Sequence, residues 1–129
     1  MQREPFQYAV IRLVPNIERE EFLNVGVIVF CRTRQFLQAQ VALDPGRVRG
    51  LAPALDIAEV QAHLDARVRV AAGAPDAGPI AQLPQSERFH WLVAPSSTII
   101  QSSPVHSGLC DDPGATLERL FQALVVGPR

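Results

Sequence analysis

Three segments in the first third of the chain carry the apolar patterns of β-strands, at residues 7–14, 23–31 and 35–43. The second is apolar on both of its alternating sets of positions, which predicts a strand at the centre of its sheet. Because the polar turn at residues 32–34 is short, the second and third segments are expected to pair as an antiparallel hairpin. Gly26 falls inside the second segment and predicts a bulge or a close backbone contact.

Two later segments show helical periodicity. In the first, Asp56 has the chemistry of an N-cap, apolar residues recur at helical spacing through Val68, and Gly73 is a plausible end. In the second, Asp112 is the expected cap before Pro113, and residues 127–128 end the apolar stripe. A weaker helical turn is indicated at residues 47–51.

The region between these helices gives less regular patterns. Residues 74–85 are rich in proline and read as a loop, residues 87–94 fit either a strand or a helix, residues 97–102 suggest a short strand, and residues 103–112 suggest a loop. The order of elements predicts an α+β fold in one domain spanning residues 1–129. We expect an antiparallel sheet of about four strands with two or three helices packed mainly on one face.

Composition narrows the function. The 129 residues carry 12 basic and 13 acidic side chains, for a net charge of −1, which argues against binding to nucleic acid or to a membrane surface. No apolar run approaches the ~20 residues of a membrane-spanning helix, and the N-terminus lacks a signal-peptide pattern, so we expect a cytoplasmic protein. All 12 basic residues are arginine, which excludes lysine nucleophiles and a P-loop lysine.

Arg12 stands out because it lies in an otherwise apolar strand. The connection that follows carries Arg19 among the carboxylates of Glu18, Glu20 and Glu21. One interpretation is an arginine–glutamate network that holds this connection against the sheet. The other is a surface that recognises an anion through Arg12 and Arg19.

A second concentration of polar side chains occurs late in the chain, and it contains His90, Ser102, Ser103, His106, Cys110, Asp111 and Asp112. His106 and Cys110 supply only two of the roughly four ligands of a zinc site. No nucleophile elbow accompanies the serines, and a Cys110–His106 nucleophile pair would need each side chain to be oriented independently. We therefore expect no metal, no cofactor and no catalytic set, and we expect no structural disulfide between Cys31 and Cys110.

The segments FQYAVIRLVPNIEREEFLNVGVIVFC, LPQSERFHWLVAPSSTIIQSSPVHSGLCDDP and LERLF resemble the bacterial family named domain of unknown function 3037. The resemblance covers nearly the whole chain and implies no assigned activity. It also implies a place among the small companions encoded beside kinases similar to HipA. The family motifs fall on both polar regions, at Arg12, Pro15, Arg19, Glu21, Phe22, Asn24, Gly26, Ser102, Ser103, Pro104, Gly108 and Asp112.

Two functions of different classes follow. The first is a non-enzymatic protein-interaction module, with a HipA-like kinase as a candidate partner. A homodimer is compatible with this function and with the alternative, because an exposed sheet edge needs protection. The alternative is a small enzyme or ligand-binding domain that recognises a phosphorylated or carboxylated molecule through Arg12, Arg19 and His106. The residues predicted to bind the ligand or partner are Arg12, Arg19, Glu21, Asn24, His90, Ser102, Ser103, His106 and Asp111.

Overall fold

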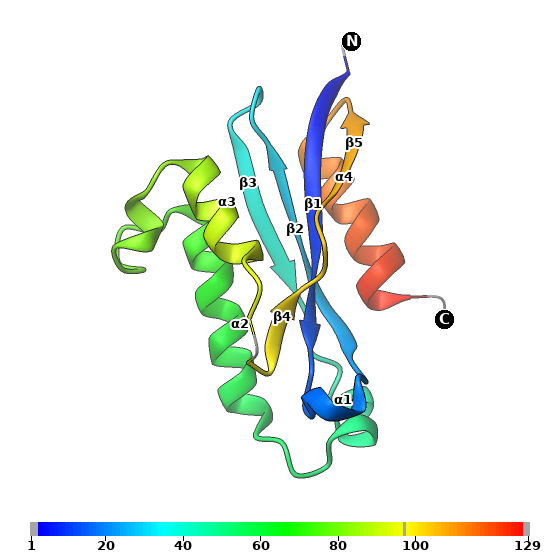
Figure 1. The fold of residues 1–129 in the computed structure, drawn as a ribbon. Coiled ribbons are helices and arrows are strands. Elements are labelled where there is room, and N and C mark those ends of the chain that lie inside the picture. The colour runs from blue at the N-terminus through cyan, green and yellow to red at the C-terminus, as the bar shows by residue number, and fades with distance from the viewer. Residues whose placement is uncertain (1–2, 97, 128–129) are drawn as a thin grey trace.

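A computed structural model describes residues 3–96 and 98–127 (Figure 1). The strands are β1 (Glu4–Leu13), β2 (Leu23–Cys31), β3 (Phe36–Val41), β4 (Ile100–Ser102) and β5 (His106–Cys110). The α-helices are α1 (Pro45–Leu51), α2 (Ile57–Ala72), α3 (Gln85–Val93) and α4 (Pro113–Phe121), and a π-helical turn extends α4 over Gln122–Val126. Short 3-10 turns occupy Ile17–Arg19 and Ile80–Gln82.

The strands form one antiparallel sheet in the order β3-β2-β1-β4. β5 pairs with the other half of the same side of β1, so β4 and β5 follow one another along that side. β4 lies against residues 11–13 of β1, and β5 lies against residues 4–8. The predicted hairpin is confirmed as the β2–β3 pair.

Helices cover both faces of the sheet (Figure 1). On one face, α1, α2 and α3 enclose a core that includes Ile28, Leu37, Val60 and Leu64. On the other face, α4 and its π-helical turn cover a smaller core whose buried members include Phe6, Val27, Val29, Cys31, Cys110, Leu117, Leu120, Phe121 and Val125. The α+β prediction is confirmed, although the described chain has four α-helices rather than two or three, and α4 lies opposite the other three.

Local sequence explains where α2 and α4 begin and where α2 ends. The side chain of Asp56 accepts a hydrogen bond from the backbone N–H of Glu59, and Gly73 ends α2 in the left-handed conformation, with φ of 71°. Asp112 caps α4 by accepting from the N–H groups of Gly114 and Ala115, directly before Pro113.

Two assignments change in the second half of the chain. The ambiguous segment at 87–94 belongs to helix α3, and the segment at 103–112, expected to be a loop, contains strand β5. β5 has little strand propensity of its own, since it consists of His-Ser-Gly-Leu-Cys. It forms because its backbone pairs with the first half of β1, a partner about 100 residues away in sequence.

A bulge bends β2 at Gly26. Gly26 pairs with Ile11, and the next pair is Asn24 with Arg12, so Val25 has no opposite residue. Val25 therefore packs in the core beneath α1–α3, whereas strict alternation would place it with Val27 beneath α4. Within the described residues, none of the helices is long and apolar enough to cross a membrane.

Candidate functional site

The sheet ends on one side in β4 and β5, which together form an interrupted edge strand. The interruption lies at residues 103–105, where Ser103 is buried (3% exposed). The N–H of Ser103 donates to the carbonyl of Val10, and the N–H of Val10 donates to the Ser103 hydroxyl, each at 2.8 Å. That hydroxyl in turn donates to the carbonyl of Pro104 at 2.8 Å. Ser103 thus satisfies a buried backbone donor where the regular ladder stops.

The same contacts show which backbone groups of β5 face outward. Both the N–H and the carbonyl of Val10 are directed at Ser103. In a strand, the backbone N–H and carbonyl groups point to the same side at every second residue. The backbone groups of residues 4, 6 and 8 of β1 therefore point toward β5, like those of Val10. The register pairs them with residues 110, 108 and 106 of β5. The N–H and carbonyl groups of the intervening residues, Ser107 and Leu109, therefore point away from β1 toward the open edge.

The side chains along this edge are uncharged and partly apolar. Leu109 is 60% exposed and Val105 is 39% exposed, and residues 105–110 contain no acidic side chain and no arginine. The opposite edge of the sheet is different. β3 packs against α2 and α3 on one face and against α4 on the other, and none of the large apolar side chains that are exposed belongs to it. β5 is the edge that resembles a protein-binding strand.

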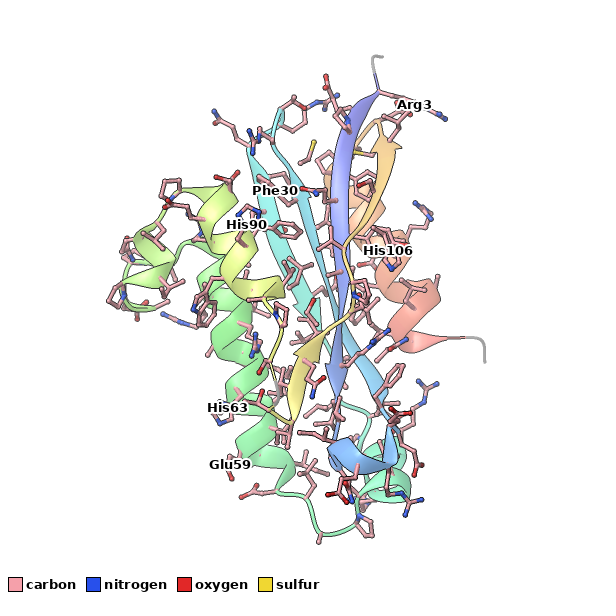
Figure 2. The ribbon with its side chains drawn as sticks, viewed as in Figure 1. Arg3, Phe30, Glu59, His63, His90 and His106 are labelled. Carbon is pink, nitrogen blue, oxygen red and sulfur yellow. The ribbon has the colours of Figure 1, made fainter. Side chains whose placement is uncertain are left out.

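A row of rings lies beside the edge on the face that α4 covers. The Tyr8 ring contacts the His106 imidazole, with centroids 5.1 Å apart, and stacks near Phe6 at 6.0 Å. Gly108 makes room for this row, because a Cβ at that position would lie 2.8 Å from the Phe6 ring. His106 is exposed and is the part of the row nearest to the edge (Figure 2).

Arg12 continues this face toward the other end of β1. Its guanidinium carbon lies 4.2 Å from the centroid of the Phe22 ring, and its Nε is buried without a hydrogen-bond partner among the described residues. Arg12 lies opposite Gln101 of β4, and its neighbour Ile11 lies opposite Ser102. The two polar regions of the sequence thus meet at the β1–β4 pair.

Asn24 and the pair Arg19–Glu21 lie next to this meeting point in sequence but have other partners. Asn24 is opposite Arg12, and its side-chain amide donates to the carbonyl of Leu124 at 3.0 Å, which ties β2 to the turn after α4. Arg19 forms an exposed ion pair with Glu21 at 2.5 Å. Both line a cavity of about 450 Å³ that faces Leu51 of α1. Of the expected arginine–glutamate network, the structure contains the Arg19–Glu21 pair, whereas Arg12 contacts the Phe22 ring instead of a carboxylate.

His90 and Asp111 lie apart from that surface. His90 is exposed on α3, in the helical layer on the opposite side of the sheet from α4 (Figure 2). Asp111 is exposed between β5 and α4, beyond the end of β1 that is farthest from Arg12. The structure therefore places Ser102, Ser103 and His106 along the side of β1 that faces β4 and β5, with Arg12 in β1 beside them. Ser102 is paired with Ile11 of the core beneath α1–α3, so its side chain lies on the opposite face of the sheet from Arg12 and His106.

The structure does not bring together the Cys110–His106 nucleophile pair or the zinc ligands considered from the sequence. His106 and Cys110 lie at opposite ends of β5, about 13 Å apart at ~3.3 Å per residue. Both cysteines are free and buried, and burial raises the pKa of the Cys110 thiol, which disfavours the reactive thiolate. Among the residues that the structure describes, no group of three or more His, Cys, Asp and Glu side chains could hold a metal ion.

Sequence reasoning missed Val105 and Leu109 as surface residues. Each is a single apolar residue among serine, glycine and histidine, a pattern that gives no strand signal. The one available indication is the run of uncharged residues from 96 to 110, broken only by histidine, in a chain whose other connections carry charges.

Comparison with known proteins gives one result. A family model described as a protein of unknown function (DUF3037) matches residues 8–125, nearly the full length. No curated protein and no solved structure matches the chain. By this match, the chain belongs to the DUF3037 family.

Proposed function

We propose that this protein is a non-enzymatic interaction module that binds a protein partner along the β4–β5 edge. The observation that carries the proposal is the open side of β5. There the backbone groups of Ser107 and Leu109 face outward beside the exposed side chains of Leu109 and Val105. Strands that are not meant to pair usually carry charged side chains at such an edge, and β5 has no lysine, arginine or carboxylate.

Binding would extend the sheet by one strand. The partner supplies an extended segment whose backbone pairs with Ser107 and Leu109, and its apolar side chains cover Leu109 and Val105. The break at residues 103–105 limits this segment to about the length of β5, because Pro104 has no N–H to donate. The His106–Tyr8 row beside the edge offers a polar and aromatic surface that favours one partner over others.

The family resemblance names a class of partner, a kinase similar to HipA, and the open edge equally suits a second copy of this chain. The proposal places the protein in the cytoplasm, together with such a kinase. In either complex, the β5 backbone pairs with a strand from the other molecule. The two partners are distinguished by the stoichiometry of the complex.

Recognition of an anionic group is the second candidate, and the unpaired Nε of Arg12 favours it. Arg12 and His106 lie on the same face of the sheet but about 13 Å apart along β1, and Arg19 already pairs with Glu21. An anionic ligand would therefore be held by Arg12 without the other two residues. Replacement of Arg12 by Gln would abolish that binding and leave edge binding intact.

Co-purification with the kinase, tagged in both orders, tests the first proposal. The variant Leu109→Lys places a charge on the proposed edge, and Gln38→Lys places the same charge on the exposed part of β3. We expect the unmodified chain and Gln38→Lys to be retained with the kinase and Leu109→Lys to be lost. Sedimentation of the chain alone tests for a homodimer: in that case the unmodified chain and Gln38→Lys should sediment as dimers, and Leu109→Lys should sediment as a monomer.

Two outcomes would overturn the proposal. One is a chain that stays monomeric and fails to associate with the kinase in either order of tagging. The other is equal retention of Leu109→Lys and Gln38→Lys, which would move the contact surface away from β5. Circular dichroism of both variants shows whether the fold is retained.

A further inference from the structure

A second feature is a cavity next to β4 that no residue of β5, the strand of the proposed partner contact, lines. It has a volume of about 370 Å³ and lies between α2 and the segment that leads into β4. Its lining includes Glu59, Val60, His63, Arg67, Ile99 and Ile100. Glu59, His63 and Arg67 follow one another at intervals of four residues, so they lie along one face of α2; Figure 2 labels the first two.

Arg67 is the unusual member of this group. The other arginine side chains nearby have acceptors: Arg69 pairs with Asp76, and Arg88 donates to the carbonyls of Leu83 and Ala71. Arg67 is half-buried, and no described residue forms an ion pair or a hydrogen bond with it. Burial lowers the pKa of its guanidinium, a sign that the charge is held where water is scarce.

The ring of Trp91 on α3 lies next to this guanidinium. The Arg67 guanidinium carbon lies 6.0 Å from the centroid of the Trp91 ring, at the outer limit of a cation–π contact. Contact with an aromatic ring leaves the edge of the guanidinium, with its parallel N–H groups, free to hold a planar anion in a bidentate arrangement. A carboxylate has this geometry.

The rest of the lining selects the remainder of the ligand. Val60 and Ile100 are almost fully buried, Ile99 is 37% exposed, and these side chains give the cavity apolar walls. Two acidic residues, Asp56 and Glu59, line the other end of the cavity, and Glu59 is two turns from Arg67, about 12 Å along the helix axis. Their negative charges disfavour a phosphate dianion more than a single carboxylate bound at the Arg67 end.

We propose that this cavity binds a small monocarboxylic acid with an apolar body. The carboxylate is held by Arg67, with His63 one turn away as a further hydrogen-bond donor, and the apolar body lies against Ile99 and Val60. A volume of about 370 Å³ is at the lower end of the range for small-molecule sites, which suits a ligand smaller than a typical drug molecule.

The single tryptophan of the chain, Trp91, contacts Arg67 from outside the cavity, so its fluorescence reports on ligand binding through Arg67. The probes are 3-phenylpropionate, its neutral amide 3-phenylpropanamide, and inorganic phosphate, each titrated into the full chain. We expect a saturable change with 3-phenylpropionate and at least tenfold weaker binding of the amide and of phosphate. Equal binding of acid and amide, or tighter binding of phosphate, would overturn the proposal.

Matched variants locate the response. Arg67→Gln removes the proposed anchor, and Arg69→Gln removes one arginine from the same helix outside the cavity. We expect at least a tenfold loss of affinity in the first variant and less than a twofold change in the second. An equal loss of affinity in both variants would contradict the role of Arg67 as the anchor. If Arg67→Gln does not fold, the comparison of the acid with its amide in the unmodified chain tests whether the carboxylate is recognised. Leu109→Lys should bind 3-phenylpropionate normally, which separates this inference from the proposed interaction edge.

Discussion

At the scale of single residues, Gly26 determines how β2 bends. A Cβ at this position would lie 2.9 Å from both the backbone oxygen of Gln40 and the Cγ1 of Val41 on the neighbouring strand. The adjacent bulge moves Val25 to the other face of the sheet. The sequence contained the glycine and the expectation of a bulge or a close contact. It could not show which residue would change face, because that depends on the pairing register with β1.

The replacement Gly26→Ala should destabilise the protein by about 1–3 kcal/mol, since one of the clashing atoms is a backbone oxygen that cannot turn aside. Gly50→Ala is the control, because no atom lies within 4 Å of a Cβ at position 50, within α1. That change should leave the free energy of unfolding unaltered or raise it by up to about 1 kcal/mol. Urea denaturation measures both, and equal effects of the two changes would refute the close-contact explanation.

At the scale of elements, the helices α2 and α4 are determined by local sequence, whereas strand β5 depends on a partner that is distant in sequence. Caps and apolar stripes within 20 residues determine α2 and α4, and both were predicted with nearly their observed limits. β5 has neither signal, because its five residues (His-Ser-Gly-Leu-Cys) show no apolar alternation and its partner strand lies at the start of the chain. The same holds for the break between β4 and β5, where the role of Ser103 depends on the position of Val10.

Ser103→Ala tests that break. The change leaves the buried N–H of Val10 without its acceptor, and such an unsatisfied donor costs about 1–3 kcal/mol. Ser107→Ala, on the exposed part of β5, should change the free energy of unfolding by less than about 0.5 kcal/mol. Thermal and chemical denaturation provide the comparison. If the two variants are equally stable, the Ser103 hydroxyl is not the required acceptor.

At the scale of the whole molecule, one sheet carries a core on each face. Val27 and Val29 of β2 point into the core beneath α4, while Ile28 and Phe30 point into the core beneath α1–α3. This shared strand explains why β2 is apolar on both alternating sets. The register of β1 against β4, which places Arg12 opposite Gln101 and Ile11 opposite Ser102, could not be predicted from local sequence. A single domain remains a prediction, and the shared strand supports it.

A single domain should unfold in one transition. Trp91 lies on α3, on the side of the core beneath α1–α3, whereas Leu120 lies in the core beneath α4. Leu120→Ala should cost about 2–5 kcal/mol and lower the unfolding midpoint equally by Trp91 fluorescence and by far-ultraviolet circular dichroism. A fluorescence midpoint that stays in place while the circular dichroism midpoint falls would show two separately folding units.

The central claim is that the β5 edge is open in the monomer and closed by a partner strand in the complex, whether the partner is a kinase or a second copy of this chain. Amide hydrogen exchange, resolved to single residues in β5, tests this most directly. In the monomer, at a concentration where sedimentation shows no dimer, Ser107 and Leu109 should exchange fast, and Gly108 between them should be protected by β1. In the complex, both outward amides should become protected by tenfold or more. A stable complex in which the exchange of Ser107 and Leu109 is unchanged would contradict the account.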